Sequence, residues 1–458
     1  MTAQSYCIVG GGISGLVAAY RLRVAVGDDA AITVFDPADR LGGILRTELV
    51  GGVPMDVGAE AYVLRRPEVP ALLAELGLSD RQRVPTGVRP LIHSGGRLHP
   101  LPPDTVAGIP SSAASVAGLV DEDTVARIEA EPGRKLDWIR GSDPVVAALV
   151  AGRFGEQVVA RSVDPLLGGV YAGSAATIGL RAAVPAVAAA LDGGAAGLTD
   201  AIRAVLPPAG GGPVFGSLRG GYQALLDALV QRSRIRWVRA GVSALEPGWT
   251  VRDDTGAHWH ADAVILAVPA AVTATLAADV APVAAAVAGR IVTASPVVVA
   301  LAVPADTPFP QASGVLVASG EPLHAKAITL SSRKWGRFGQ PVAAGGVAQV
   351  RLSMGRFGDD AAMRACDDTL LAWARSDLAE VFGIAVDPVD VRVQRWVDAM
   401  PQYGPGHADL VARLRSGLPP TLGVAGNYLD GIGVPACVGA AGRAVADVVS
   451  ALGGQVAR

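Results

Sequence analysis

Residues 6–22 read YCIVGGGISGLVAAYRL. A short apolar strand, residues 6–10, leads into a glycine-rich turn, and apolar residues then recur at helical spacing as far as Leu22. A second apolar strand, residues 31–35, is followed directly by Asp36. Strand, glycine turn, helix and strand in this order predict a parallel βαβ unit of the kind that binds a dinucleotide.

The glycines of this stretch fill the pattern G-x-G-x-x-G with Gly10, Gly12 and Gly15. The first permits a tight turn, the second lets backbone amides approach a pyrophosphate, and the third lets helix and strand pack closely. The carboxylate of Asp36 is expected to accept hydrogen bonds from ribose hydroxyls. The alternative, a glycine-rich structural turn, does not require an acidic residue at that distance. The expected contacts also include Gly11, Ile13 and Ser14, since the helix N-terminus attracts negative charge.

Composition limits the classes of function. The chain has 458 residues, 50% of them hydrophobic, so two or three lobes are expected. The net charge of −3 predicts no nucleic-acid partner. The three cysteines, Cys7, Cys366 and Cys437, are far apart and show no metal-ligand or redox spacing, which favours a reducing cytoplasm and no metal site.

No membrane-spanning segment is expected. The apolar start of the chain lacks preceding basic residues, so it is not a secretory signal. The longest apolar region, residues 282–304, contains Arg290, Pro296 and Pro304 and is interpreted as buried strands. A weak association with a membrane surface stays open, although residues 111–206, predicted to be helical, lack a basic, aromatic-rich face.

A second motif follows the βαβ unit at residues 40–47, RLGGILRT. Its Arg40 and the pair Gly42–Gly43 resemble the glycine-doublet signature of the amine-oxidase-like flavoprotein superfamily, which implies FAD as the cofactor. The resemblance places this segment, including Leu45, along the pyrophosphate and ribityl chain. The family's arginine after the doublet is replaced here by Ile44. The stretch 51–62, GGVPMDVGAEAY, matches a segment that skirts the flavin in that family, and so implies contacts from Gly58, Ala59, Glu60 and Ala61.

The chain is expected to return to the cofactor twice. After the linker PPAGGGP at 207–213, short polar and apolar segments between residues 234 and 270 predict an antiparallel meander. The resemblance places Val242 against the adenine. Residues 424–449 form a second glycine-rich strand-to-helix unit, whose helix is expected to start near Gly439. By resemblance, Ile432, Gly433 and Val434 lie against the isoalloxazine, whereas an ordinary α/β crossover is the alternative.

Two further segments resemble oxygen-dependent porphyrinogen oxidases. Residues 394–411, QRWVDAMPQYGPGHADLV, match the segment that connects substrate and flavin domains there, with Trp396 packing on the cofactor. Without the resemblance, Tyr403 and His407 would be packed loop residues. Residues 163–183, VDPLLGGVYAGSAATIGLRAA, match the strip that lines the substrate slot, here Gly169, Val170 and Tyr171. In the predicted hairpin 89–102, Arg89 is a candidate partner for a propionate carboxylate.

The implied fold class is α/β (α+β), with a discontinuous Rossmann-like FAD-binding domain, a substrate domain with a mixed β-sheet, and a helical lobe. The predicted boundaries are residues 1–80, 214–272 and 406–458 for the FAD-binding domain, 81–100 and 273–405 for the substrate domain, and 101–213 for the helical lobe. In the helical lobe, Asp143 and Asp164 precede prolines and are expected to cap helix N-termini.

The resemblance is greatest to the actinobacterial type of coproporphyrinogen III oxidase. It implies FAD- and O₂-dependent oxidation of coproporphyrinogen III to coproporphyrin III with release of H₂O₂ in heme biosynthesis, and transient contact with the next enzyme of that pathway. No catalytic acid, base or metal ligand is predicted. Protoporphyrinogen IX as substrate, an amine oxidase, a carotenoid desaturase and a non-catalytic nucleotide-binding scaffold remain as alternatives. An amine oxidase should offer an aromatic cage, and only 5% of the residues are aromatic.

Overall fold

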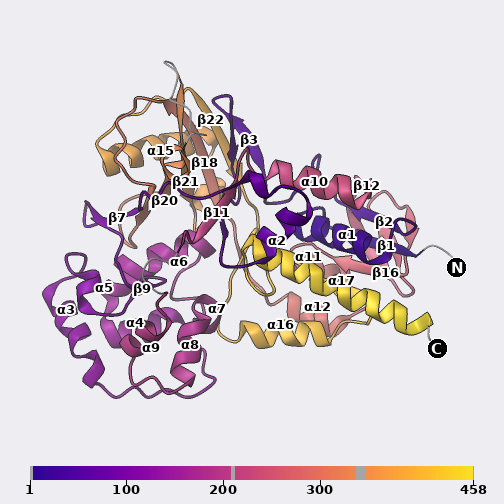
Figure 1. Ribbon diagram of the computed structural model, residues 1–458, viewed down its shortest axis with the longest axis horizontal. Coiled ribbons are helices and arrows are strands. Elements are labelled where there is room, and N and C mark those ends of the chain that lie inside the picture. Colours follow the sequence, from indigo (N-terminus) through magenta and orange to yellow (C-terminus); the bar gives the residue numbers. More distant parts are fainter. Residues whose placement is uncertain (1–3, 208–211, 337–345, 457–458) are drawn as a thin grey trace.

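The computed structural model describes residues 4–207, 212–336 and 346–456. Figure 1 shows three regions: a βα region that holds both ends of the chain, a large sheet with its own helix, and a group of helices set apart from the sheets. The N-terminal, central and C-terminal segments meet in the first region. Helices and several sheets occur together, which confirms the predicted α/β (α+β) class.

The βα region is built on a parallel sheet. Its central strand follows from the first apolar segment of the chain, which is almost wholly buried and therefore suits a strand covered on both faces. Each neighbouring pair in this sheet runs parallel. The order is β12-β2-β1-β16-β24, with bounds β1 Ser5–Val9, β2 Ala31–Phe35, β12 Arg236–Val238, β16 Ala263–Leu266 and β24 Leu422–Val424.

One face of this sheet is covered by α1 (Ile13–Val26), which lies between α10 (Gln223–Ser233) and α17 (Val434–Val456). Helix α1 is apolar nearly all round, as expected for a helix buried between other elements. Helix α17 includes a 20-residue stretch, Val434–Gly453, that is long and apolar enough to span a membrane, and half of its most apolar window is buried inside the protein. Because it packs on α1, α2 (Glu68–Glu75) and the sheet, its composition is that of a core helix.

Two details of this region differ from the sequence-based expectations. The antiparallel meander comprises β13 (Val242–Glu246), β14 (Thr250–Asp253) and β15 (His258–His260), whereas the flanking segments β12 and β16 join the parallel sheet. Residues 263–266 are all buried, and such an unbroken apolar run suits a central parallel strand. Helix α17 starts at Val434 and not near Gly439, because Pro435 fits the first turn of a helix.

The opposite face is covered by α11 (Ala270–Leu276), α12 (Pro282–Ala288) and α16 (His407–Ser416). The expectation of strands throughout 282–304 is therefore wrong for its first part. The sequence PVAAAVA consists mainly of alanine, the best helix former, and starts with proline at the first helical turn. The predicted boundary at residue 272 would assign α12 to the substrate domain, although it packs in the core of the βα region.

The second region is a mixed sheet. Its neighbouring strands are antiparallel except for β19 and β7, which run parallel. Helix α15 (Asp367–Phe382) packs on one face through Leu370, Ala374 and Leu378. The order is β22-β18-β21-β20-β19-β7-β8, with bounds β22 Asp390–Arg395, β18 Val297–Pro304, β21 Val347–Met354, β20 Ala325–Thr329, β19 Gly314–Val317, β7 Leu91–Ser94 and β8 Arg97–Pro100.

The third region is the helical lobe, with its own apolar core. Its helices are α3 Glu122–Glu129, α4 Val146–Phe154, α5 Glu156–Val158, α6 Asp164–Tyr171, α7 Leu180–Ala183, α8 Pro185–Asp192 and α9 Leu198–Val205, and a π-helical turn, Val159–Val163, joins α5 to α6. Neither predicted N-cap is observed. Asp143 accepts from the amides of Arg181 and Gly406, and Asp164 continues a helical run and accepts from the amide of Ala175.

Shorter elements connect the three regions. The hairpin of β3 and β4 packs on β18 through Val50 and Met55. The short elements are β3 Thr47–Val50, β4 Val53–Asp56, β5 Tyr62–Val63, β6 Gln82–Arg83, β9 Thr105–Val106, β10 Ile109–Pro110, β11 Phe215–Leu218, β17 Thr293–Ala294, β23 Met400–Pro401, α13 Ser331–Trp335, α14 Ala361–Arg364 and the 3₁₀ turns Ser79–Arg81, Ala113–Val116 and Glu131–Gly133. The domain boundaries given above stay a prediction.

Candidate functional site

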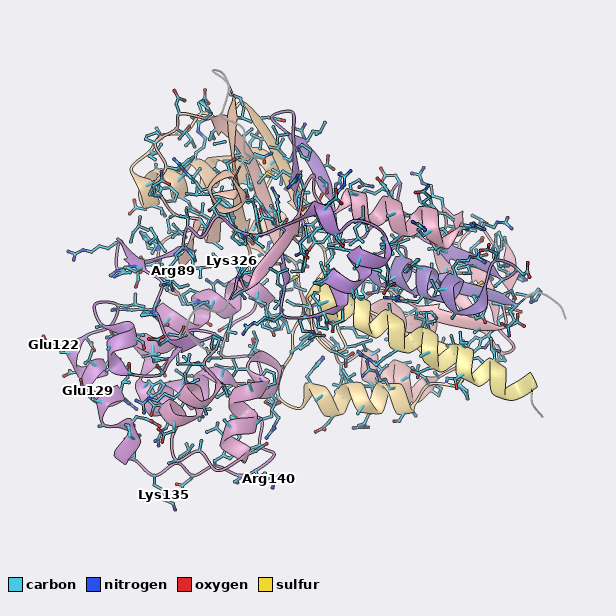
Figure 2. All side chains as sticks on the ribbon, viewed as in Figure 1. Arg89, Glu122, Glu129, Lys135, Arg140 and Lys326 are labelled. Atoms are coloured by element: carbon cyan, nitrogen blue, oxygen red, sulfur yellow. The ribbon has the colours of Figure 1, made fainter. Side chains whose placement is uncertain are left out.

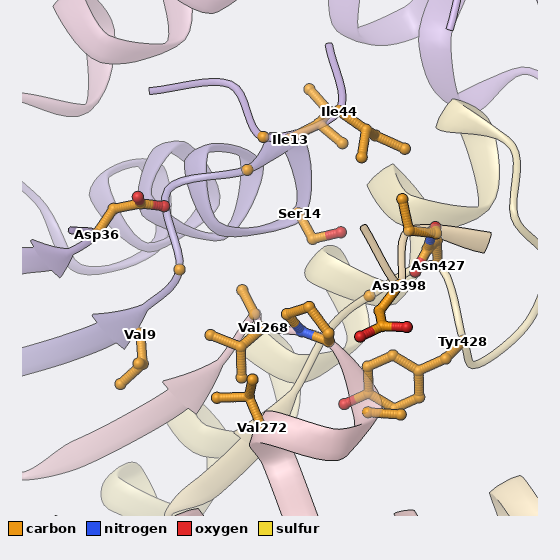
Figure 3. A pocket seen from close by; sticks show the side chains of 18 of the residues that line it. Val9, Ile13, Ser14, Asp36, Ile44, Val268, Val272, Asp398, Asn427 and Tyr428 are labelled. Carbon is orange, nitrogen blue, oxygen red and sulfur yellow. The ribbon is translucent and has the colours of Figure 1, made fainter. Parts of the chain in front are cut away.

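A cavity of about 370 Å³ lies at the carboxyl ends of β1, β2 and β16, where open α/β sheets bind their ligands. In Figure 3, Asp36 lies at one end of this pocket and Asn427 and Tyr428 lie at the other. The lining comes from strand ends and loops that are far apart in sequence: Val9, Gly10, Gly12, Ile13, Ser14, Phe35, Asp36, Pro37, Gly43, Ile44, Gly241, Val242, Ala267, Val268, Pro269, Ala270, Val272, Leu276, Thr293, Asp398, Ala399, Pro401, Gly426, Asn427, Tyr428 and Cys437.

Steric contacts require glycine at two positions of the glycine turn, Gly10 and Gly15. Gly10 has φ +105°, and a Cβ there would lie 2.3 Å from the carbonyl oxygen of Ala267. A Cβ on Gly15 would lie 1.9 Å from the carbonyl oxygen of Gly10. Gly12 is the N-cap of α1, and no side chain caps the helix there. The first amides of a helix lack intrahelical partners, so this end of the pocket can bind a pyrophosphate.

Asp36 lines the same end of the pocket, as predicted from its spacing. Its Oδ2 accepts a 2.6 Å hydrogen bond from the Gly11 amide, and its Oδ1 accepts a 3.0 Å bond from the Ala38 amide. The amide of Gly11 therefore holds the carboxylate in place. Gly241 and Val242 form the neighbouring wall, and the resemblance placed Val242 against the adenine.

The glycine doublet lies against the glycine turn. Gly42 and Gly43 have φ +121° and +57°, and a Cβ on Gly43 would lie 3.0 Å from the Cα of Gly12. The Arg40 guanidinium donates to the carbonyls of Leu41, Gly43 and Leu45. Arg40 thus fixes the loop that lines the pocket. Leu45 is fully buried in the core behind that loop.

Residues 57–61 join the βα region to the mixed sheet. A Cβ on Gly58 would lie 1.8 Å from the Ile44 carbonyl oxygen, and Trp396 packs there, donating from Nε1 to the Val57 carbonyl at 2.9 Å. Ala59 packs against the core of the βα region, and Ala61 is half-buried in the same loop. This loop therefore contacts the glycine-doublet loop on one side and the mixed sheet on the other.

Glu60 ties this loop to the mixed sheet by charge. Its carboxylate lies 3.0 Å from Lys334 Nζ and 3.9 Å from Arg351 Nη1, and Ser331 donates to it at 2.7 Å. Burial alone would raise the pKa of Glu60, but the charges of Lys334 and Arg351 and the hydroxyl bond outweigh it and lower the pKa to about 2. Glu60 is therefore ionised throughout the physiological range.

The opposite end of the pocket is built by the MPQYGPGH segment. Tyr403 Oη donates to the Asn427 carbonyl at 2.5 Å and accepts from the Gly431 amide at 3.0 Å. The His407 ring stacks on Tyr403 at 3.9 Å, and its Nε2 lies 3.0 Å from the Tyr428 carbonyl oxygen. Burial lowers the pKa of His407, so its neutral form is favoured. These two side chains position the loop that leads into α17.

Three residues that the resemblance placed on the isoalloxazine follow this loop. Ile432 is half-buried, Gly433 is exposed, and Val434 is buried at the start of α17. They lie at the N-terminus of that helix, where the partial positive charge of the helix dipole is greatest. Their contacts with a flavin stay a prediction.

The proposed substrate residues lie on two different elements. Gly169, Val170 and Tyr171 end α6, with Val170 50% exposed and Tyr171 half-buried, its ring 6.0 Å from that of Tyr403. Arg89 precedes β7, its side chain is exposed, and its carbonyl accepts from the Ser313 amide. Figure 2 shows Arg89 in the zone between the mixed sheet and the helical lobe.

Several lining residues were not predicted as site residues. Val268, Pro269 and Asn427 were not among the expected contacts, and they line the pocket because they follow β16 and β24. The Tyr428 hydroxyl lies 3.0 Å from Thr273 Oγ1 and supports the same wall. Only the rule that ligands bind beyond the carboxyl ends of parallel strands could have found them.

The pocket fits a dinucleotide on the observations above: a glycine cradle that side chains would fill, free helix amides, and a carboxylate at the ribose position. Within residues 4–207, 212–336 and 346–456, no group of three or more His, Cys, Asp or Glu could hold a metal ion. The geometry thus supports binding of an extended cofactor between Asp36 and Asn427.

Comparison with known proteins agrees with this interpretation. The family described as flavin containing amine oxidoreductase matches residues 13–449. The chain is 71% identical to the coproporphyrinogen III oxidase of Mycobacterium tuberculosis (strain ATCC 25618 / H37Rv) and covers 100% of both chains. It is 69% identical to the enzyme of the same name from Mycobacterium leprae, again over 100% of both.

A similar solved structure is that of a protein from Exiguobacterium sp. 255-15 described as a protoporphyrinogen oxidase. It has a TM-score of 0.86 and 27% identity, and the match covers 98% of this chain and 99% of that one. The chain belongs to the flavin-containing amine oxidoreductase family, and its cofactor is FAD.

Proposed function

We propose that the chain oxidises coproporphyrinogen III to coproporphyrin III in heme biosynthesis, with FAD as cofactor and O₂ as the electron acceptor. The observation that carries this proposal is the 71% identity, over the whole length of both chains, to curated coproporphyrinogen III oxidases. The glycine turn, the glycine doublet and the Tyr403–His407 segment all lie around one pocket, in support of it.

The reaction removes six electrons and six protons from the macrocycle, and three O₂ molecules that take them up leave as three H₂O₂. FAD, when bound, would supply a two-electron acceptor that O₂ can reoxidise. The chain's task is to hold the substrate beside the flavin, to exclude water and to allow the macrocycle to be presented again for each round.

Named residues have distinct parts in this task. Asp36 and the amides at the start of α1 hold the nucleotide end of the cofactor. Tyr403 and His407 fix the loop before α17, whose N-terminus favours negative charge at the other end. Gly169, Val170 and Tyr171 line the substrate slot, and Arg89 binds a propionate carboxylate.

The enzyme acts in the cytoplasm, at most in loose contact with a membrane surface, and hands its product to the next enzyme of the pathway in a transient complex. No nucleic acid takes part, in agreement with the net charge of −3. Protoporphyrinogen IX is a second candidate substrate, because the structure at TM-score 0.86 is described as a protoporphyrinogen oxidase.

An aerobic assay of the purified FAD-loaded protein tests the proposal. Coproporphyrinogen III and protoporphyrinogen IX are supplied side by side, and porphyrin fluorescence and H₂O₂ are followed. We expect faster oxidation of coproporphyrinogen III and one H₂O₂ for each pair of electrons removed. A clear preference for protoporphyrinogen IX would move the activity to the second candidate, and inactivity on both would refute the proposal.

A further inference from the structure

Two cations, Lys326 and Arg356, lie between the mixed sheet and the helical lobe, and neither has an acidic partner among the residues that the structure describes. Lys326 is 5% exposed, and its Nζ donates to the carbonyls of Met354 at 3.2 Å and Gly355 at 2.7 Å. Arg356 is half-buried; its Nη2 reaches only the Val317 carbonyl at 3.5 Å, and its Nη1 is buried without a hydrogen-bond partner. Among the residues that the structure describes, no carboxylate lies within 4.0 Å of either charge.

The backbone directs Lys326 into this position. The register between β20 and β21 shifts between Ala325 and Ala327, so Lys326 occupies a β-bulge. Bulges re-aim a side chain and are over-represented beside active sites. Regular strand pairing is therefore interrupted at Lys326, the residue whose charged side chain is buried.

Two nearby carboxylates, Asp164 and Asp359, act on the charge of Arg356, but among the described residues neither forms an ion pair with it. Asp164, in the first turn of α6, instead accepts hydrogen bonds from the Ala175 amide, Ser174 Oγ and Ser319 Oγ. Burial, and then the charge of Arg356, lower the pKa of Lys326 to about 7. A buried, charged lysine beside an arginine that lacks an acidic partner among the described residues is stabilised by an added anion.

The pair adjoins the proposed substrate strip. Helix α6 packs on β19 and β20, and a Cβ on Gly168 would lie 2.7 Å from Arg356 Nη1. Gly169, Val170 and Tyr171 follow directly, and the Phe357 amide donates to the Ala172 carbonyl at 2.7 Å. Figure 2 shows Lys326 in the zone between the sheet and the helical lobe, as it does Arg89.

Lys326 could serve merely to satisfy two carbonyls at the end of β21. A neutral donor would do so without the cost of a buried charge, and this role leaves Arg356 Nη1 unexplained. We propose that Lys326 and Arg356 form a subsite that binds a propionate carboxylate of the porphyrinogen. This inference rests on the proposed function, and it names residues that bind the charged periphery of that substrate.

The test compares a charged ligand with its uncharged ester. Coproporphyrin III and its tetramethyl ester are titrated against the FAD-loaded wild type and the variants Lys326→Gln and Arg356→Met, with porphyrin fluorescence as the readout. Lys326→Gln keeps a donor for the two carbonyls. The control Lys135→Met removes a lysine that is 88% exposed on the helical lobe.

For each subsite variant we expect the affinity for the tetra-acid to fall about 10- to 100-fold. The free energy lost with a hydrogen bond to a charged group corresponds to a change in Kd of this size. Affinity for the ester should stay within about threefold, because its carbonyls carry no charge. FAD content and the midpoint of thermal unfolding show whether each variant is folded. If Lys326→Gln does not fold, the comparison of acid and ester with Arg356→Met alone decides the test.

Unchanged binding of the tetra-acid, or an equal loss for acid and ester, would overturn the subsite. The control variant should bind both ligands like the wild type. The proposed function is judged separately in the same preparation, by wild-type oxidation of coproporphyrinogen III. If the wild type turns over coproporphyrinogen III and the variants bind the tetra-acid as the wild type does, only the subsite is rejected. If the wild type shows no turnover, the proposed function is rejected.

Discussion

Replacing Gly15 by alanine tests the geometry of the cofactor site most directly. The new Cβ would lie 1.9 Å from the Gly10 carbonyl oxygen, whereas real Cβ atoms almost never approach closer than 3.0 Å. The N-terminus of α1 must therefore move away from β1 by at least about 1.1 Å, the difference between these distances. That movement displaces the amides that we propose hold the pyrophosphate.

Overpacking of this kind costs about 1–3 kcal/mol. If the cost falls on the bound state, the Kd for FAD rises about 5- to 150-fold. Gly442→Ala is the matched control, since Gly442 lies in α17 and a Cβ there meets nothing within 4 Å. In this control, helix propensity should raise stability by up to about 1 kcal/mol with no change in FAD affinity.

The measurement is titration of apoprotein with FAD, followed by quenching of flavin fluorescence, with circular dichroism to verify folding. If Gly15→Ala binds FAD within twofold of the wild type, α1 does not pack on β1 as described. Weaker binding in Gly442→Ala as well would show that any new methyl group disturbs this domain.

Three further changes have defined outcomes. Asp36→Ala should weaken FAD binding about 10- to 100-fold, because a charged hydrogen-bond acceptor is lost. Unaltered affinity in the same titration would contradict the proposed contact of Asp36 with the ribose. Asp28→Ala, which removes an exposed ion pair, is the control. Glu60→Gln should lower the urea midpoint at pH 7, because two cations lose their partner. The folded-state pKa of Glu60 is about 2, below its ordinary 4.5, so its contribution is present above pH 4.5 and is lost as the pH falls toward 2; a variant equally destabilised at pH 3 and pH 7 would refute this. Tyr403→Phe should cost about 1–2 kcal/mol and speed FAD release, since the loop before α17 loses two hydrogen bonds; stopped-flow release at the wild-type rate would argue against it.

The sequence was most informative where chemistry is local. Gly10, Gly15 and Asp36 could be interpreted from spacing alone, because each requirement involves atoms within one βαβ unit. The helical nature of residues 282–288 was misjudged, since an apolar, alanine-rich segment satisfies strand and helix patterns equally well. The start of α17 was placed too late, because Pro435 fits the first turn of a helix and marks an earlier start. Membership of β12 and β16 in the parallel sheet could not be read from their short lengths, because pairing depends on partners distant in the chain.

By itself, the order of residues determined that a dinucleotide cradle exists near the N-terminus and which family its motifs resemble. Only the tertiary structure decided that Asn427 and Tyr428 line the same pocket, and that Tyr403 and His407 hold their loop by hydrogen bonds to its backbone. It also decided that Lys326 and Arg356 lie together without a carboxylate partner among the described residues. The reason is physical: a cradle depends on local steric limits of glycine, whereas a pocket wall or a charge cluster depends on which distant segments the packed core brings into contact.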